Sequence, residues 1–91
     1  SSDTNDNLSE LMSEVEHNRW NCEKLLLGFR TPNDDERVFM ELDKANAKLY
    51  KQKYYIHLDI RPYKDLKEDI KNYDRCMIKA IPLLEKELTK L

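Results

Sequence analysis

The sequence predicts a small, mainly α-helical domain of two long helices, a middle helix and one short extended segment. The first observation behind this fold class is that the apolar residues, 40% of the 91, recur mostly at the helical period. The second is that helix-start and helix-stop residues divide the chain into three such stretches. The third is one stretch near the middle in which apolar and polar residues alternate. We expect residues 1–7 to form a disordered tail and residues 8–91 to form one domain with a thin core.

The composition argues against several classes of protein. The net charge of −2 gives no basic face for nucleic acid. No apolar run approaches the roughly 20 residues of a membrane span, and no secretion signal is visible. Cys22 and Cys76 have no metal-ligand spacing, so we expect two reduced, half-buried thiols. We therefore expect a cytoplasmic protein without nucleic-acid or membrane partners.

The first predicted helix covers residues 8–27. Asn7 is its expected cap, and Glu10 completes a capping box three residues on. Gly28 ends the helix because a left-handed backbone costs Gly nothing. The apolar residues of this stretch form a single stripe, which we expect to face the core. The stripe comprises Leu8, Leu11, Met12, Val15, Cys22, Leu26 and Phe29.

A charged residue interrupts this stripe. Arg19 falls within it, and Glu16 and Glu23 lie on its flank. Because burial of an unpaired charge is costly, we expect Arg19 to pair with one of these carboxylates or with Asp74. The four residues are predicted to form a structural polar cluster, and the alternative is a cluster that orients a pocket.

The only Trp lies on a second, smaller apolar face of the same helix. Trp20 shares this face with Leu27, and His17 and Lys24 border it. An aromatic ring beside charged groups suits either packing at a second interface or stacking on a planar ligand. Both interpretations stay open at this point.

The middle helix is predicted to begin at Thr31, with Pro32 in its first turn and acidic residues 34–36 at its positive end. We expect it to run to about Tyr50. Its expected apolar stripe comprises Val38, Phe39, Leu42, Ala45 and Leu49.

Residues 51–63 are rich in aromatic and β-branched residues. Ile56, Leu58 and Ile60 alternate with polar residues, and Pro62 follows, so this stretch is predicted to be extended. A single strand cannot make a sheet, so it must pack on helices or pair with another chain.

The last helix is expected to begin near Asp65 or Lys67. Pro82 lies inside it and removes one backbone hydrogen bond, so we expect a kink or a break there. The heptad-like stripe of this helix comprises Leu66, Ile70, Tyr73, Met77, Ile81, Leu84, Leu88 and Leu91.

The sequence lacks the common patterns of catalytic and cofactor sites. It has no Ser/His/Asp order, no metal motif and a single Gly, which rules out a Gly-rich phosphate loop. His17 and His57 are more simply structural than catalytic. We therefore expect a protein that is not an enzyme and that carries no cofactor and no metal.

Two blocks of residues match a known family in order and spacing. The first is Glu16-His17-x-Arg19-Trp20-x-x-Glu23-Lys24-x-x-x-Gly28-Phe29-Arg30. The second is His57-x-x-Ile60-x-Pro62-Tyr63-x-x-Leu66, followed by Tyr73-Asp74-Arg75-x-x-Ile78-x-x-Ile81-Pro82-x-Leu84. Together they resemble the ryanodine-receptor repeat, the RyR domain, in its prokaryotic single-copy form. The family usually joins the blocks by a short loop with Tyr-Gly-Pro and an acidic pair, and here residues 31–55 form a longer insert.

The resemblance implies a non-enzymatic, ligand-sensing or regulatory module that binds an adenine nucleotide or a related small molecule. In that role Trp20 would stack on the base. The expected anion contacts are Lys24, Arg30 and Arg75, and the residues expected to line the site are His17, His57 and Tyr63. The alternative is a structural interaction module that pairs with itself or with a neighbouring domain.

A weak homodimer is also expected. A single repeat lacks the second copy that tandem family members carry, and the extended segment around Ile56 to Ile60 has no partner strand in the sequence. A thin core also leaves little to cover Leu84, Leu88 and Leu91 at the end of the last helix. A twofold dimer would bury these surfaces.

Overall fold

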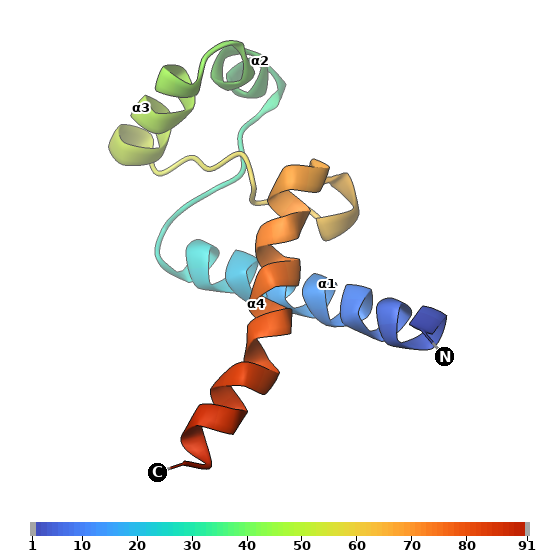
Figure 1. Ribbon diagram of the computed structural model, residues 1–91. Helices are drawn as coiled ribbons and strands as arrows, with labels where there is room; N and C mark the ends of the chain where they lie inside the picture. The colour runs from blue at the N-terminus through green and yellow to red at the C-terminus, as the bar shows by residue number, and fades with distance from the viewer. Residues whose placement is uncertain (1, 91) are drawn as a thin grey trace. The chain divides into compact units, whose positions relative to one another are not determined.

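The computed structural model describes the backbone of residues 2–90 and the side chains of residues 6–90, and it confirms a mainly α fold. Its elements, shown in Figure 1, are α1 (Ser2–Leu26), α2 (Asp34–Leu42), α3 (Lys44–Tyr54), the 3-10 helix η1 (Tyr63–Asp65) and α4 (Glu68–Leu88). The chain divides into two compact units. The first unit is Ser1–Arg19 with Tyr63–Leu91, and the second unit is Trp20–Pro62.

The two ends of α1 differ in how well the sequence predicts them. The helix begins at Ser2, so Asn7 lies inside it and the predicted capping box is wrong. Residues 2–7, expected in a tail, belong to α1, and Ser1 lies outside the described residues. The predicted end is confirmed, because Gly28 has a φ of 93°. There the N–H groups of Gly28 and Phe29 donate to the carbonyls of Leu25 and Lys24, at 3.1 and 3.0 Å, which is a Schellman motif.

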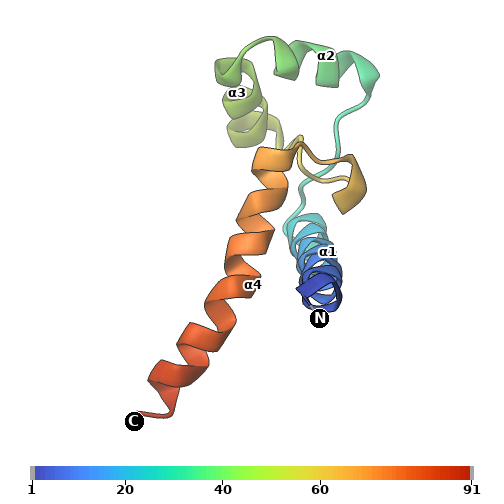
Figure 2. The same ribbon diagram turned by 45° about the vertical axis from the view of Figure 1, so that its right-hand side comes forward.

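The single middle helix of the prediction is two helices in the second unit. α2 is capped by Asn33, not Thr31: the Asn33 side chain accepts from the N–H of Glu36, whose carboxylate accepts from the N–H of Asn33. α2 ends at Asp43, whose backbone is extended and whose side chain accepts from the N–H of Ala45 at the start of α3. An Asp side chain that competes for backbone donors in this way favours a new helix start. Figure 2 shows the turn between α2 and α3.

The apolar stripe expected for the middle helix is largely exposed. The buried residue of α2 is Met40, which lies outside the predicted stripe. Four large members of that stripe are exposed. They are Val38, Phe39, Leu42 and Leu49.

The predicted extended segment is shorter than expected and has a partner within the chain. Residues 51–54 belong to α3, and Tyr55 ends that helix with a φ of 58°. Ile56 then forms a parallel β-bridge with Arg30. The N–H of Arg30 donates to Tyr55 at 2.9 Å, and its carbonyl accepts from His57 at 3.1 Å. A turn follows instead of a strand, and Ile56 and Ile60 are buried.

In the first unit, α4 begins at Glu68, close to the prediction, and continues through Pro82 without a break. Leu66 is buried just before the helix. Residues 81–90 are all exposed, and Leu91 lies outside the described residues. Both views show the C-terminal half of α4 projecting away from α1, with no other element of the same unit beside it (Figures 1 and 2). Among residues 2–90, no helix is both long enough and apolar enough to cross a membrane.

Candidate docking surface

A polar contact holds α1 in the first unit. The carboxylate of Glu10 accepts a 2.6 Å hydrogen bond from the Tyr63 hydroxyl. It also accepts two from the Arg75 guanidinium, from Nε at 3.0 Å and from Nη2 at 2.8 Å. Arg75 reaches Glu68 at 2.8 Å and Asn72 at 2.9 Å as well. The contact therefore joins α1 to η1 and to the first half of α4.

This contact shifts the protonation of its members. Hydrogen bonds from Arg75 and then Tyr63 lower the pKa of Glu10 to about 2. Burial, followed by the hydrogen bond to Glu10, raises the pKa of Tyr63 to about 12. The Arg75 guanidinium has a raised pKa because it donates to Glu10 and Glu68. Near neutral pH the carboxylate is thus ionised and the phenol neutral, the states in which one accepts and the other donates.

Two further residues place the same face of α1 inside. Ser13 and His17 are buried, with 0% and 3% of their surface exposed. The Ser13 hydroxyl donates to the Ser9 carbonyl at 2.9 Å, and His17 Nδ1 lies 3.3 Å from an Asp74 carboxylate oxygen. Glu10, Ser13 and His17 follow the 3–4 spacing of one helix face. The inner face of α1 is therefore its polar face.

The apolar stripe of α1 consequently faces outward, so the prediction that it forms the core is wrong. At about 100° per residue, the four members of the stripe that belong to the first unit lie on average about 170° around the helix axis from Ser13 and His17. Their exposed fractions are 55% for Leu8, 56% for Leu11, 39% for Met12 and 59% for Val15.

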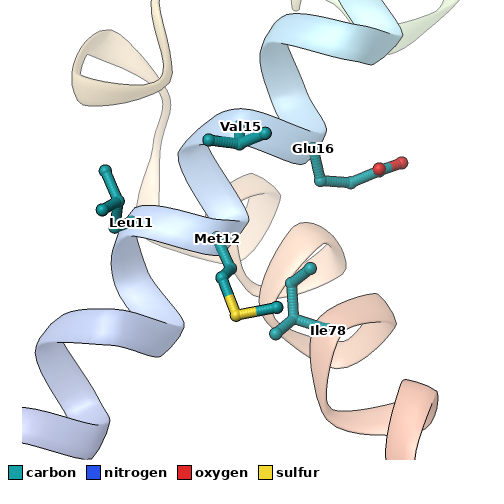
Figure 3. Close-up of a pocket in the computed structure, with 5 residues that line it drawn as sticks. All are labelled: Leu11, Met12, Val15, Glu16 and Ile78. Atoms are coloured by element: carbon teal, nitrogen blue, oxygen red, sulfur yellow. The ribbon is translucent and has the colours of Figure 1, made fainter.

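An open hollow of about 250 Å³ lies beside this stripe. Figure 3 shows its lining, in which Met12 of α1 and Ile78 of α4 lie next to each other. The lining residues are Leu11, Met12, Val15, Glu16 and Ile78.

Glu16, the charged residue in the lining of the hollow, forms an ion pair with Arg19. The guanidinium of Arg19 binds the Glu16 carboxylate at 2.8–3.1 Å and lowers its pKa. The predicted pairing of Arg19 is thus confirmed for Glu16, but Arg19 is exposed. In the rest of the predicted polar cluster, Asp74 contacts His17 and Glu23 is an exposed residue of the second unit.

The part of the heptad-like stripe that lies within α4 is largely exposed too, as expected for the end of this helix. The helix has no fully buried residue. Its large exposed apolar residues on this stripe are Tyr73, Met77, Ile81, Leu84 and Leu88.

The second unit places Trp20 in an aromatic cluster. The ring of His57 meets Trp20 edge-on, with centroids 5.0 Å apart. The Lys24 ammonium lies 5.7 Å from the Trp20 ring and 5.4 Å from the Phe29 ring, and Phe29 also meets Tyr55 at 5.2 Å. Trp20 is half-buried. Phe29 and Tyr55 belong to this cluster although neither was predicted as a site residue.

The seven predicted ligand-binding residues fall into two groups, one in each unit. His17, Tyr63 and Arg75 belong to the first unit, and Trp20, Lys24, Arg30 and His57 belong to the second.

Two of the three predicted anion-binding residues already hold carboxylates. Arg30 donates to both oxygens of Glu36 at 2.8 and 2.7 Å, and Arg75 holds Glu10 and Glu68. A ligand anion would therefore compete with carboxylates of the chain at Arg30 and Arg75.

Both cysteines are free thiols, and they are exposed rather than half-buried as predicted. Within the described side chains, no group of three or more His, Cys, Asp or Glu residues is arranged to hold a metal ion.

Comparisons of this chain with models of protein families, with curated proteins and with solved structures found no match. The similarity to the RyR repeat thus remains a resemblance of motifs.

Proposed function

We propose that this chain is a non-enzymatic protein-interaction module. The docking surface of this proposal is formed by Leu8, Leu11, Met12 and Val15 of α1 with Met77, Ile81, Leu84 and Leu88 of α4. The observation that carries the proposal is the orientation of α1, which turns Ser13 and His17 inward and its apolar stripe outward. Of the two roles suggested by the sequence, this geometry favours the structural interaction module.

The energetics support a partner on this surface. Complete burial of an exposed Leu, Val or Met side chain stabilises a complex by about 1.5–3 kcal/mol. The four α1 residues retain roughly half of their exposure, so each offers about 1 kcal/mol to a partner that covers it. Exposed apolar patches on proteins commonly mark interaction sites.

Ligand sensing is a second candidate, and it depends on the second unit. Half-buried Trp20, with the Lys24 ammonium beside its ring, has the features that suit a planar ligand with a negative charge. This role is also what the resemblance to the RyR domain implies, with an adenine nucleotide as the first ligand to test.

Photo-crosslinking in the cells that make the protein tests the interaction module. A benzophenone amino acid replaces Val15 on the docking surface or, as a control, exposed Leu42 of α2. We expect a discrete protein adduct from position 15 that Leu11→Glu abolishes, whereas Leu11→Glu leaves any adduct from position 42 unchanged. The proposal fails if position 15 gives no protein adduct, or if its adduct is insensitive to Leu11→Glu.

A further inference from the structure

We infer that the partner on this docking surface is a second copy of the chain, held by a reciprocal exchange. In this dimer the exposed C-terminal half of α4 in each copy lies along the α1 stripe of the other copy. The inference rests on the proposed function and gives its surface a specific occupant.

The two stripes match in length and spacing. Ile81, Leu84 and Leu88 recur at intervals of three and four residues, as do Leu8, Leu11 and Val15. Each set spans seven residue steps, or about 10 Å of helix. Residues 81–90 are exposed throughout, and the half-helix that carries them projects free of its own unit (Figures 1 and 2). The end of α4 is therefore available to cover a helix-sized apolar surface elsewhere.

The charges of the two segments are also complementary. With His counted as neutral, residues 6–19 carry four carboxylates and one Arg, a net charge of −3. Residues 79–90 carry three Lys and two Glu, a net charge of +1. Contact between α1 and the end of α4 thus joins segments of opposite sign, whereas contact between two α1 stripes would join two acidic segments. Complementary charge favours the correct pairing and opposes the others.

The area that the interface must bury also favours a second copy of the chain. A stable interface buries about 800 Å² per partner, more than one short helix offers alone. A second copy makes the contact twice, because each chain provides one α4 end and one α1 stripe. The result is a closed twofold dimer in which both exposed stripes are covered.

The experiment uses sedimentation velocity across a concentration series, on wild type and on three exposed Leu→Glu variants. Leu11→Glu damages the α1 stripe, and Leu84→Glu damages the α4 stripe. Leu83→Glu is the matched control, because Leu83 is about as exposed as Leu84, at 66% against 60%, but lies about 100° from it around the helix axis. Circular dichroism checks that each variant keeps its helices.

We expect wild type and Leu83→Glu to dimerise alike. Leu11→Glu and Leu84→Glu should each raise the dimer Kd by about tenfold or more, since each buries a carboxylate against leucine. Mixing Leu11→Glu with Leu84→Glu should recover part of the association, because the mixed dimer has one intact contact.

Three results would overturn the exchange: a mixture no tighter than either variant alone, sensitivity to Leu84→Glu but not to Leu11→Glu, or a wild-type mass near 11.0 kDa up to millimolar concentration. Photo-crosslinking separates this failure from failure of the proposed function. An adduct from position 15 to a different protein would sustain the module and exclude the second copy. An adduct of twice the chain mass is required by the exchange.

Discussion

The Tyr63 hydroxyl donates a 2.6 Å hydrogen bond to the Glu10 carboxylate, and this bond lies on the same side of α1 as buried Ser13 and His17. Arg75 donates to the same carboxylate, so α1 is held by its polar side. The apolar stripe lies on the opposite face of α1 and is exposed.

Removal of the Glu10 charge should destabilise the protein. Glu10→Gln keeps the size of the side chain but loses the ionised acceptor of Tyr63 and Arg75. Hydrogen bonds to charged groups contribute about 1.5–3 kcal/mol, and the 44% exposure of the Glu10 side chain lowers our expectation to about 1–2 kcal/mol. Urea unfolding measures the loss, with exposed Glu14→Gln as the control on the same helix. Equal midpoints for the two variants would contradict a holding role for Glu10.

Glu10 should also make the unfolding free energy depend on pH in the acidic range. The pKa of Glu10 is about 2 in the folded protein against an ordinary value of 4.5, so the unfolded chain binds the proton first. Its contribution is complete above pH 4.5 and is lost as the pH falls towards 2. The unfolding free energy of Glu10→Gln should therefore fall less over this range than that of wild type. Parallel pH profiles for the two proteins would show that Glu10 does not carry the effect.

The break between α2 and α3 should depend on one side chain. Asp43 accepts from the Ala45 N–H at 2.9 Å and caps α3. Asp43→Ala removes the cap and should cost about 1 kcal/mol, whereas Asp43→Asn should cost little, because Asn caps equally well. Thermal unfolding of the pair gives the comparison, and an alanine variant as stable as the asparagine variant would refute the capping role.

Ligand sensing by the second unit predicts a fluorescence response from Trp20. Adenine nucleotide that stacks on this ring should quench the emission with saturation, and Lys24→Met should weaken the response because it removes the adjacent cation. The chain has no other Trp, so the signal reports this site alone. A flat titration up to millimolar nucleotide would argue against an adenine nucleotide as the ligand.

The sequence predicts some local features well and the inner faces of the helices poorly. The Gly28 stop and the start of α4 depend on residues close in sequence, and both were predicted. The inner face of α1 depends on Tyr63 and Arg75, which lie 53 and 65 residues from Glu10. Periodicity cannot supply such long-range partners, so the apolar stripe was taken for the core.

Two signals in the sequence could have corrected the predictions, one for the inner face of α1 and one for the single middle helix. Glu10, Ser13 and His17 share the spacing of a helix face as regular as the apolar one, and a small Ser at its centre suits close packing. Asp43 lies in an otherwise continuous helical pattern, where an Asp competes for backbone donors. The burial of Met40 has no comparable signal, because α2 offers several apolar residues on other faces.

Thiol labelling of α1 tests the central claim, the outward apolar stripe, most directly. In a background in which the exposed cysteines are replaced (Cys22→Ser and Cys76→Ser), Val15→Cys reports the stripe and Ser13→Cys reports the polar face. In dilute protein we expect Val15→Cys to react about as fast as an unfolded thiol and Ser13→Cys to be protected by at least about tenfold, since its position is fully buried. Raising the protein concentration should slow the reaction at position 15 if a second copy covers it. Protection of Val15→Cys in dilute protein, together with fast labelling of Ser13→Cys, would contradict the account.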